Sequence, residues 1–325
     1  MSLSDLKHNV GASKLKLIHQ QQSNRKHLRS IYLLCVFRDE NLLLEYFVEY
    51  YRSLGVTHFI MIDNLSEDEG PEYLKSLKNI NLHLFCTEES YRDAKYGTRW
   101  INQILEKYCI DHYCFTVDVD ELFLFDSRKY QTLHDLIDDM ESSGTNVVPV
   151  TLLDMYPERT NDSYQKGTEF LRHSPFFDDL SDAYYEERGA IYGSFVHKVG
   201  GVRKRVLGAT VCIHKFPFFK YEFYPLGVAP GYHFFQSDGK VLLQSENIKL
   251  HGKLSVLLHF KFIKPQFMEF IEKRVSNNQD WENSAEYRSY LQVLQSKKTL
   301  DFYDERYTKR LIKHEDLEKF FACCL

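Results

Sequence analysis

Three carboxylates stand within four residues of the segment FTVDVDEL, where Asp118 and Asp120 are two positions apart and Glu121 follows. Like charges this close repel one another, and burying them is costly unless a positive group lies beside them. On extended backbone, residues two apart point to the same side. Asp118 and Asp120, with apolar Val119 between them, could therefore hold a divalent cation together with phosphate oxygens, since hard cations prefer oxygen ligands. The simpler alternative is a solvated acidic turn.

Two further polar groups follow apolar runs. FRDEN at 37–41 brings Arg38, Asp39 and Glu40 together. IDNLSEDEG at 62–70 contains Asp63, Asn64 and Asp68. Asx and Ser side chains often bond their own backbone in turns, which would make the second group purely structural. A carboxylate there could instead hold ribose hydroxyls or the edge of a base, and the residue types leave both interpretations open.

Positive side chains and one histidine could complete such a site. Arg38 or Arg99 could bind a diphosphate, as guanidinium groups do, although surface arginines are more often solvated. His259 lies within the apolar segment VLLHFKF, where burial requires a partner. His259 is therefore either a metal ligand or a hydrogen-bonded core histidine.

The elements that must position these groups alternate between strand and helix. Strands are predicted at 30–37, 58–63, 80–86, 113–123 and 146–156, and helices at 41–55, 70–78, 97–109 and 130–144. Such alternation predicts an α/β fold, with a mainly parallel sheet flanked by helices. The three polar groups fall at the carboxyl ends of predicted strands, where ligands bind in open α/β sheets. The sequence therefore predicts that they converge on one site.

The pattern is looser after residue 156. Residues 157–190 predict a long functional loop, 253–263 a late strand, and 264–325 a helical C-terminal extension. We therefore divide the chain into a polar, basic arm at 1–29, a domain at 30–263 and the extension at 264–325.

Composition narrows the classes of function. Of the 325 residues, 43% are hydrophobic and 27% charged, which fits a globular protein with a substantial core. The net charge of −5 predicts no nucleic-acid partner. Seven cysteines without a C-x-x-C pair, and no secretory signal, predict reduced thiols in the cytoplasm. No apolar run reaches the roughly 18 residues of a membrane span, so a membrane contact would be peripheral, through the basic arm.

Several segments in the chain occur in an order that carries a resemblance. They are VFRDENLLLEYFVEYYRSLGVTHFIMIDNLSEDEG, FTVDVDELF, GGVRKRVLG, HKFPFF, LLHFKFI and WENSAEYRSYL, which together cover roughly residues 30–295. In this order they resemble the family 2-like glycosyltransferases, most of all a bacterial branch with R-D-E and D-V-D-E motifs. His214 departs from that pattern, because relatives often have Ser or Thr before the Lys, and this leaves the acceptor side open.

The resemblance implies a GT-A fold, a nucleotide-diphospho-sugar donor, by default a UDP-sugar, and Mn²⁺ or Mg²⁺. Residues 30–156 would be the nucleotide-sugar half of the domain and 157–263 the acceptor half. The acceptor would be a saccharide or lipid-linked saccharide in bacterial surface polysaccharide or glycoconjugate synthesis, at the inner face of the membrane or in the cytoplasm. The residues to which the resemblance gives roles are Asp118, Asp120 and His259 for the metal, Arg38, Asp39 and Glu40 beside the nucleotide, and Asp63 at the base or ribose.

The mechanism expected from this likeness is transfer of the sugar with inversion at the anomeric carbon. A carboxylate would take the proton of the acceptor hydroxyl. Asp154, at the end of the strand TLLDMY, is our candidate for this base, and Asp179, Asp182 and Glu186 in the following loop compete with it.

Two other functions fit the same residues. A sugar-nucleotide-binding protein without turnover would have the same pocket. A phosphatase could use Asp118 as a nucleophile, but such enzymes carry their D-x-D motif on the first core strand, whereas here it falls on the fourth predicted strand.

Overall fold

The computed structural model describes residues 14–158, 163–190, 193–222, 227–237, 240–242, 247–252, 255–264, 267–277, 281–297 and 300–321. Its N-terminal half alternates strand and helix, as predicted. The elements are β2 (Ile31–Phe37), α1 (Asn41–Leu54), β3 (His58–Asp63), α2 (Gly70–Ser76), β4 (Asn81–Cys86), α3 (Thr98–Tyr108) and β5 (His112–Thr116).

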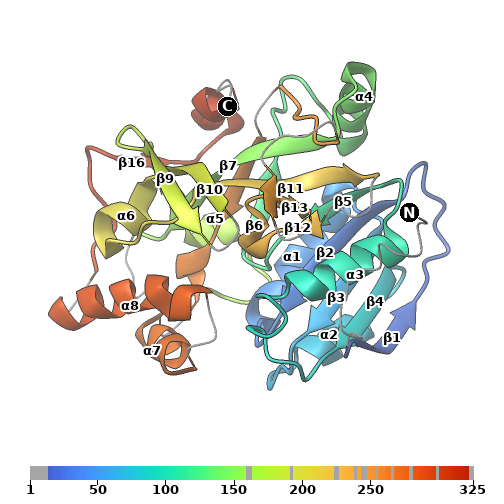
Figure 1. Cartoon of the computed structure of the whole chain (residues 1–325), viewed down its shortest axis with the longest axis horizontal. Helices are drawn as coiled ribbons and strands as arrows, with labels where there is room; N and C mark the ends of the chain where they lie inside the picture. The colour runs from blue at the N-terminus through green and yellow to red at the C-terminus, as the bar shows by residue number, and fades with distance from the viewer. Residues whose placement is uncertain are drawn as a thin grey trace.

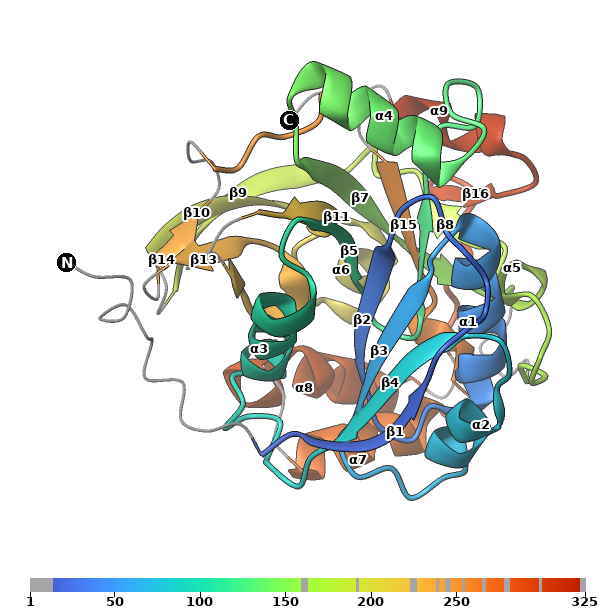
Figure 2. The same ribbon diagram turned by 90° about the vertical axis from the view of Figure 1, so that its right-hand side faces the viewer.

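Strands β4, β3, β2 and β5 are parallel neighbours in this order, and helices cover both of their faces. Alternate residues explain the two layers, because successive side chains of a strand point to opposite faces. Leu33 and Phe59 pack in one core cluster with Phe47 of α1. Leu34 and Ile60 pack in a second cluster, which also contains the side chains of α3. Figure 2 shows α1 and α2 on one side of these strands and α3 on the other.

The second half of the chain widens the sheet with antiparallel strands. Its first part comprises β6 (Glu121–Leu124), α4 (Leu133–Ser143), β7 (Val147–Tyr156), α5 (Phe170–His173), β8 (Phe176–Asp178), β9 (Tyr184–Ala190), β10 (Gly193–Val199) and α6 (Gly201–Leu207). Its second part comprises β11 (His214–Tyr221), β12 (Gly227–Val228), β13 (Phe235–Ser237), β14 (Lys240–Leu242), β15 (Ser255–His259), α7 (Phe267–Asn277), α8 (Trp281–Ser296), β16 (Thr308–Arg310) and α9 (Glu318–Phe321).

The main path of the large sheet runs β1-β4-β3-β2-β5-β11-β7-β15-β6. Strand β11 is antiparallel to both β5 and β7, whereas β15 is parallel to β7 and antiparallel to β6. The expected α/β class with helices on the sheet is confirmed, and its parallel core is the β4-β3-β2-β5 group. Figure 1 shows this group in blue and teal beside the yellow and orange strands of the second half.

Four local expectations differ from the structure, and three of them concern the N-terminal arm, the long loop and the C-terminal extension. The predicted arm at 1–29 contains strand β1 (Lys16–Gln21), which pairs antiparallel with β4. Residues 1–13 lie outside the described part. The predicted loop at 157–190 contains α5, β8 and β9, and the predicted helical extension includes the short strand β16, which pairs with β8. Local periodicity missed β1 and β16, because short edge strands are defined by their partners rather than by their own pattern.

The predicted strand at 113–123 is the difference that bears most on function. It ends at Thr116, and a new strand, β6, begins at Glu121 on the far side of the sheet. Residues 117–120 form the connection between them, so Asp118 and Asp120 lie on a turn rather than within a strand. Among the described residues, no helix combines the length and apolar character that a membrane crossing requires.

Candidate active site

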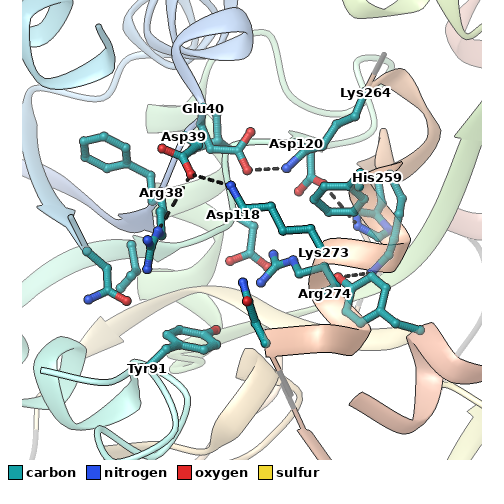
Figure 3. Close-up of a pocket in the computed structure, with 18 residues that line it drawn as sticks. Arg38, Asp39, Glu40, Tyr91, Asp118, Asp120, His259, Lys264, Lys273 and Arg274 are labelled. Atoms are coloured by element: carbon teal, nitrogen blue, oxygen red, sulfur yellow. Dashed lines mark hydrogen bonds and ion pairs between the residues drawn. The ribbon is translucent and has the colours of Figure 1, made fainter. Parts of the chain in front are cut away.

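A pocket of about 330 Å³ opens at the carboxyl ends of β2, β3 and β5. The predicted convergence of three strand ends is therefore present, with Arg38 after β2, Asn64 after β3 and Asp118 after β5. Figure 3 shows Arg38 and Tyr91 on one side of this pocket and His259 and Lys264 on the other. The residues that line the pocket are Val36, Phe37, Arg38, Asp39, Glu40, Asn64, Tyr91, Asp118, Val119, Asp120, His259, Lys261, Lys264, Phe270, Lys273, Arg274, Asn277 and Tyr287.

The two aspartates of the D-x-D segment differ in exposure. The side chain of Asp118 is 44% exposed and that of Asp120 is 17% exposed. The backbone carbonyl of Asp120 accepts a 2.8 Å hydrogen bond from Phe260, which ties the turn to the end of β15. Burial raises the pKa of Asp120, but the nearby His259, Lys264 and Lys261 outweigh that effect, so the pKa lies below its ordinary value. The side chain of Asp120 is therefore ionised at neutral pH.

Lys215 of β11 is the positive partner that the three clustered carboxylates require. Its ammonium group donates to the buried carboxylate of Glu121 and lies 3.4 Å from Oδ2 of Asp118. Glu121 also accepts a 3.1 Å hydrogen bond from the backbone N–H of Asp118, which fixes the turn. Burial lowers the pKa of Lys215, but the carboxylates outweigh that effect and raise it above its ordinary value. Glu121 thus makes structural contacts, and the motif HKFPFF supplies its cation, Lys215.

The side of the pocket opposite the R-D-E segment carries the largest share of its positive charge. Lys261 follows β15, Lys264 precedes α7, and Lys273 and Arg274 project from α7. Aromatic rings hold these cations in place: the Lys261 Nζ lies 4.6 Å from the ring centre of Tyr287, and the Lys264 Nζ 4.8 Å from that of Phe270. The sequence prediction missed all these side chains, because only the folded chain brings the segment after β15 back to the strand ends.

Ion pairs connect this cationic side to the R-D-E segment. Lys264 donates to Glu40, and the Lys273 Nζ lies 3.7 Å from Oδ2 of Asp39. Burial raises the pKa of Glu40 in spite of its lysine partner. Arg38, which is partly exposed, lies 3.7 Å from Asp39. The predicted nucleotide-facing segment therefore lies across the pocket from α7 and is already in contact with it.

The second polar group divides into one pocket residue and two turn residues. Asn64 lines the pocket, and its Nδ2 donates to the carbonyls of Thr87 and Glu89 at 3.1 and 3.0 Å. Asp63 accepts a 2.9 Å hydrogen bond from the Ser66 N–H. Asp68 accepts one of 2.7 Å from the Asn41 N–H at the start of α1. Asp63 and Asp68 do not line the pocket. Their hydrogen bonds with backbone N–H groups support the structural interpretation of this segment rather than a contact with ribose or a base.

Tyr91 is a pocket residue that the sequence did not single out. It lies in the loop between β4 and α3, and Gly97 of the same loop has a φ of 77°. A Cβ atom at Gly97 would lie 2.9 Å from the Tyr91 ring. Glycine therefore permits both the left-handed turn and the close approach of the ring. Arg99 of α3 does not line the pocket and instead bonds Glu89, which also accepts a 2.8 Å hydrogen bond from the Trp100 indole.

His259 lines the pocket and Asp154 lies behind it. The Nδ1 of His259 is 2.6 Å from Oδ1 of Asp154, and its Nε2 is 3.7 Å from Oδ2 of Asp120. Asp154 is buried within β7, two residues before its end, and its Oδ2 accepts a 2.7 Å hydrogen bond from Nε of Arg203. Burial raises the pKa of Asp154, but Arg203 and His259 outweigh that effect and lower it. Asp179, Asp182 and Glu186 do not belong to the pocket lining either.

The donor set partly fits a divalent cation. Among the described residues, no three His, Cys, Asp or Glu side chains are already gathered as a ligand set. Asp120 and His259 lie 3.7 Å apart, which suits two ligands at about 2.1 Å from one ion. Asp118 is directed to Lys215 and would have to turn from it to join them. This part of the pocket therefore offers two carboxylates and one imidazole as possible metal ligands, with lysine and arginine side chains nearby.

Comparisons with known proteins give only a general likeness. No protein-family model matches the chain, and no curated protein matches it either. One similar solved structure is a 4-diphosphocytidyl-2C-methyl-D-erythritol synthase, with 11% sequence identity, 44% of this chain and 68% of that chain covered, and a TM-score of 0.27. Another is HddC from Yersinia pseudotuberculosis, with 10% identity, 71% and 93% covered, and a TM-score of 0.33. At these scores the similarity carries no argument about function.

Proposed function

We propose that the protein is a glycosyltransferase of the GT-A type that transfers a sugar from a nucleotide-diphospho-sugar to an acceptor hydroxyl. The observation that carries this proposal is the combination of carboxylates and cations in one pocket. Asp118 and Asp120 come from the connection between β5 and β6, whereas Lys261 and Lys264 come from the segment between β15 and α7, and Arg274 comes from α7. A diphosphate with a divalent cation has the complementary arrangement, because the metal prefers carboxylates and the phosphates prefer lysine and arginine.

Asp118, Asp120 and His259 would hold a Mn²⁺ or Mg²⁺ ion. When bound, this ion would neutralise charge on the departing diphosphate as a Lewis acid. Lys264 and Lys273, now paired with Glu40 and Asp39, would exchange those partners for phosphate oxygens. The ring of Tyr91, which also lines the pocket, would pack against the nucleoside.

The chemistry at the sugar is proposed to proceed with inversion. The proton acceptor must be a carboxylate that reaches the pocket. Both oxygens of Asp154 already take part in hydrogen bonds, one with His259 and the other with Arg203, and the residue does not line the pocket. The base role proposed for Asp154 from the sequence therefore competes with a positioning role, which its contacts support better.

Thermal-shift measurements with UDP and GDP, with and without Mn²⁺, test the binding half of the proposal. We expect a nucleoside diphosphate to stabilise the protein more with Mn²⁺ than without, and Asp120→Asn to abolish that difference. Asp179→Asn is the matched control, because Asp179 bonds Ser181 outside the pocket. Equal metal-dependent stabilisation in wild type and Asp120→Asn would contradict the metal assignment.

Turnover separates an enzyme from a binding protein. A panel of nucleotide sugars should contain one donor that is hydrolysed slowly and transferred to an acceptor saccharide, with loss of both activities in Asp120→Asn. The anomeric configuration of the product, followed by NMR, decides between inversion and retention. Tight donor binding without hydrolysis or transfer to any acceptor would support a sugar-nucleotide-binding protein instead.

A further inference from the structure

Three polar residues form a row across neighbouring strands next to the pocket. His259 of β15 is paired in register with Asp154 of the parallel strand β7 and with Glu121 of the antiparallel strand β6. Side chains at paired positions point to the same face of a sheet, which brings the three groups together. All three are buried, so each needs a partner within the protein.

The hydrogen bonds at Asp154 have a fixed direction. Oδ2 accepts from the Nε–H of Arg203, which always carries a proton, so this oxygen can only be an acceptor. Oδ1 lies 2.6 Å from Nδ1 of His259, and an ionised carboxylate can only accept there as well. Arg203 is itself held on α6 by the carboxylate of Glu286, 3.2 Å from its Nη1, and is buried. The proton of this bond therefore belongs on Nδ1 of His259.

We propose that Asp154 is a positioning residue that fixes His259 in the tautomer with its proton on Nδ1. The lone pair of Nε2 then faces Asp120 and is available to a cation in the pocket. This inference rests on the proposed function for its purpose, since a fixed lone pair serves a metal ligand, but the tautomer itself is a property of the unliganded protein.

Asp154→Asn should reverse the tautomer without changing the shape of the side chain. Arg203 can only donate, so the amide oxygen must stay beside Nε of Arg203 and the NH₂ group must face His259. A donor at that place obliges Nδ1 to accept, and the proton of the ring moves to Nε2. The lone pair that faced Asp120 is thereby replaced by an N–H.

The matched control is Asp178→Asn. Asp178 is also a buried aspartate bonded to an arginine, with Arg205 at 2.8 Å through both Nε and Nη2 and the Tyr156 hydroxyl at 2.6 Å. These contacts of Asp178 involve Arg205 and Tyr156 rather than a histidine, so its loss should reduce stability comparably while leaving His259 unchanged. It therefore separates the tautomer from general destabilisation.

The test is ¹⁵N NMR of histidine-labelled protein at pH 8 without metal. His259→Gln identifies the signals of this ring among the 14 histidines. We expect a protonated Nδ1 and an unprotonated Nε2 in wild type and Asp178→Asn, and the reverse in Asp154→Asn. A protonated Nε2 in wild type, or an unchanged tautomer in folded Asp154→Asn, would overturn the proposal.

Mn²⁺ titration followed by electron paramagnetic resonance gives a second readout. Loss of a residue that orients a metal-bound histidine typically weakens metal binding by about 10- to 100-fold, and we expect this for Asp154→Asn but not for Asp178→Asn. Absence of Mn²⁺ binding by wild type would refute the metal in the proposed function, while the NMR result would still decide the tautomer.

Discussion

The ammonium group of Lys215 lies between Glu121 and Asp118, donating to the first and standing 3.4 Å from Oδ2 of the second. Lys215 and Glu121 are both buried, whereas Asp118 faces the pocket. One lysine therefore stabilises both the folded turn and the ligand-facing carboxylate. A cation that binds Oδ2 of Asp118 would therefore compete with Lys215 for that oxygen.

Lys215→Met should destabilise the protein strongly. It leaves the carboxylate of Glu121 buried without its cation, and breaking a buried pair in this way costs about 3–5 kcal/mol. In Lys215→Met/Glu121→Gln the loss should be smaller, because no buried charge remains. Urea unfolding of the wild type, both single variants and the double variant measures the coupling. Additive losses would contradict the pairing.

Lys273→Gln should weaken the binding of a nucleoside diphosphate with little effect on stability. The Lys273 side chain is 62% exposed, and losing one such cation from an anion site costs about 1 kcal/mol, roughly fivefold in Kd. Titration calorimetry at two salt concentrations should also give a smaller salt dependence than in wild type. Lys107→Gln, on α3 and outside the pocket lining, serves as the control, and an equal loss there would contradict a specific role for Lys273.

Asp68→Ala should lower stability but leave nucleotide affinity nearly unchanged. The carboxylate accepts hydrogen bonds from the N–H groups of Asn41 and Gly70, which begin α1 and α2. Losing such a capping interaction costs about 1–2 kcal/mol. Thermal unfolding and a UDP titration on the same sample check both statements. A large loss of UDP affinity without a loss of stability would indicate that Asp68 contributes to nucleotide binding.

Acidification below pH 6.5 should destabilise the protein, in part through His214. Burial, with the nearby His197 and Lys198, lowers the pKa of His214 to about 4. The unfolded chain then takes up a proton at about pH 6.5 that the folded chain refuses until about pH 4. One such group removes up to about 1.4 kcal/mol per pH unit as the pH falls through that window, and the stability is fully present above it.

Urea unfolding at pH 7.0 and 5.5 measures this loss, and His214→Gln should make it smaller. His58, whose pKa is also lowered to about 4, remains in the variant, so part of the pH dependence should persist. An identical loss of stability in wild type and variant would show that His214 does not contribute to the pH dependence.

The sequence was most informative where one chain segment determines the result. The alternation of β2, α1, β3 and α2 follows from local periodicity, and the convergence of Arg38, Asn64 and Asp118 follows from parallel strands ending at one edge. The end of β5 at Thr116 was missed, because FTVDVDELF alternates like one strand although its two halves pair with different neighbours.

The cationic side of the pocket could not be predicted in the same way. Lys264, Lys273 and Arg274 look like solvated charges on a helix, and nothing local indicates that α7 returns to the strand ends. The contact between Asp154 and His259 likewise depends on the register of β7 with β15, which are separated by about a hundred residues. The role of a residue that acts through a partner can be recognised only when the fold brings that partner beside it.

The pairing of β1 with β4 has a consequence for handling the protein. Strand β1 occupies the outer edge of the large sheet, and its register shifts between Leu17 and His19, a bulge that discourages a further strand from joining. A shortened chain that begins at residue 30 would leave the outer backbone groups of β4 unpaired and ready to recruit another molecule. Removing residues 1–29 to obtain a shorter protein would therefore favour self-association.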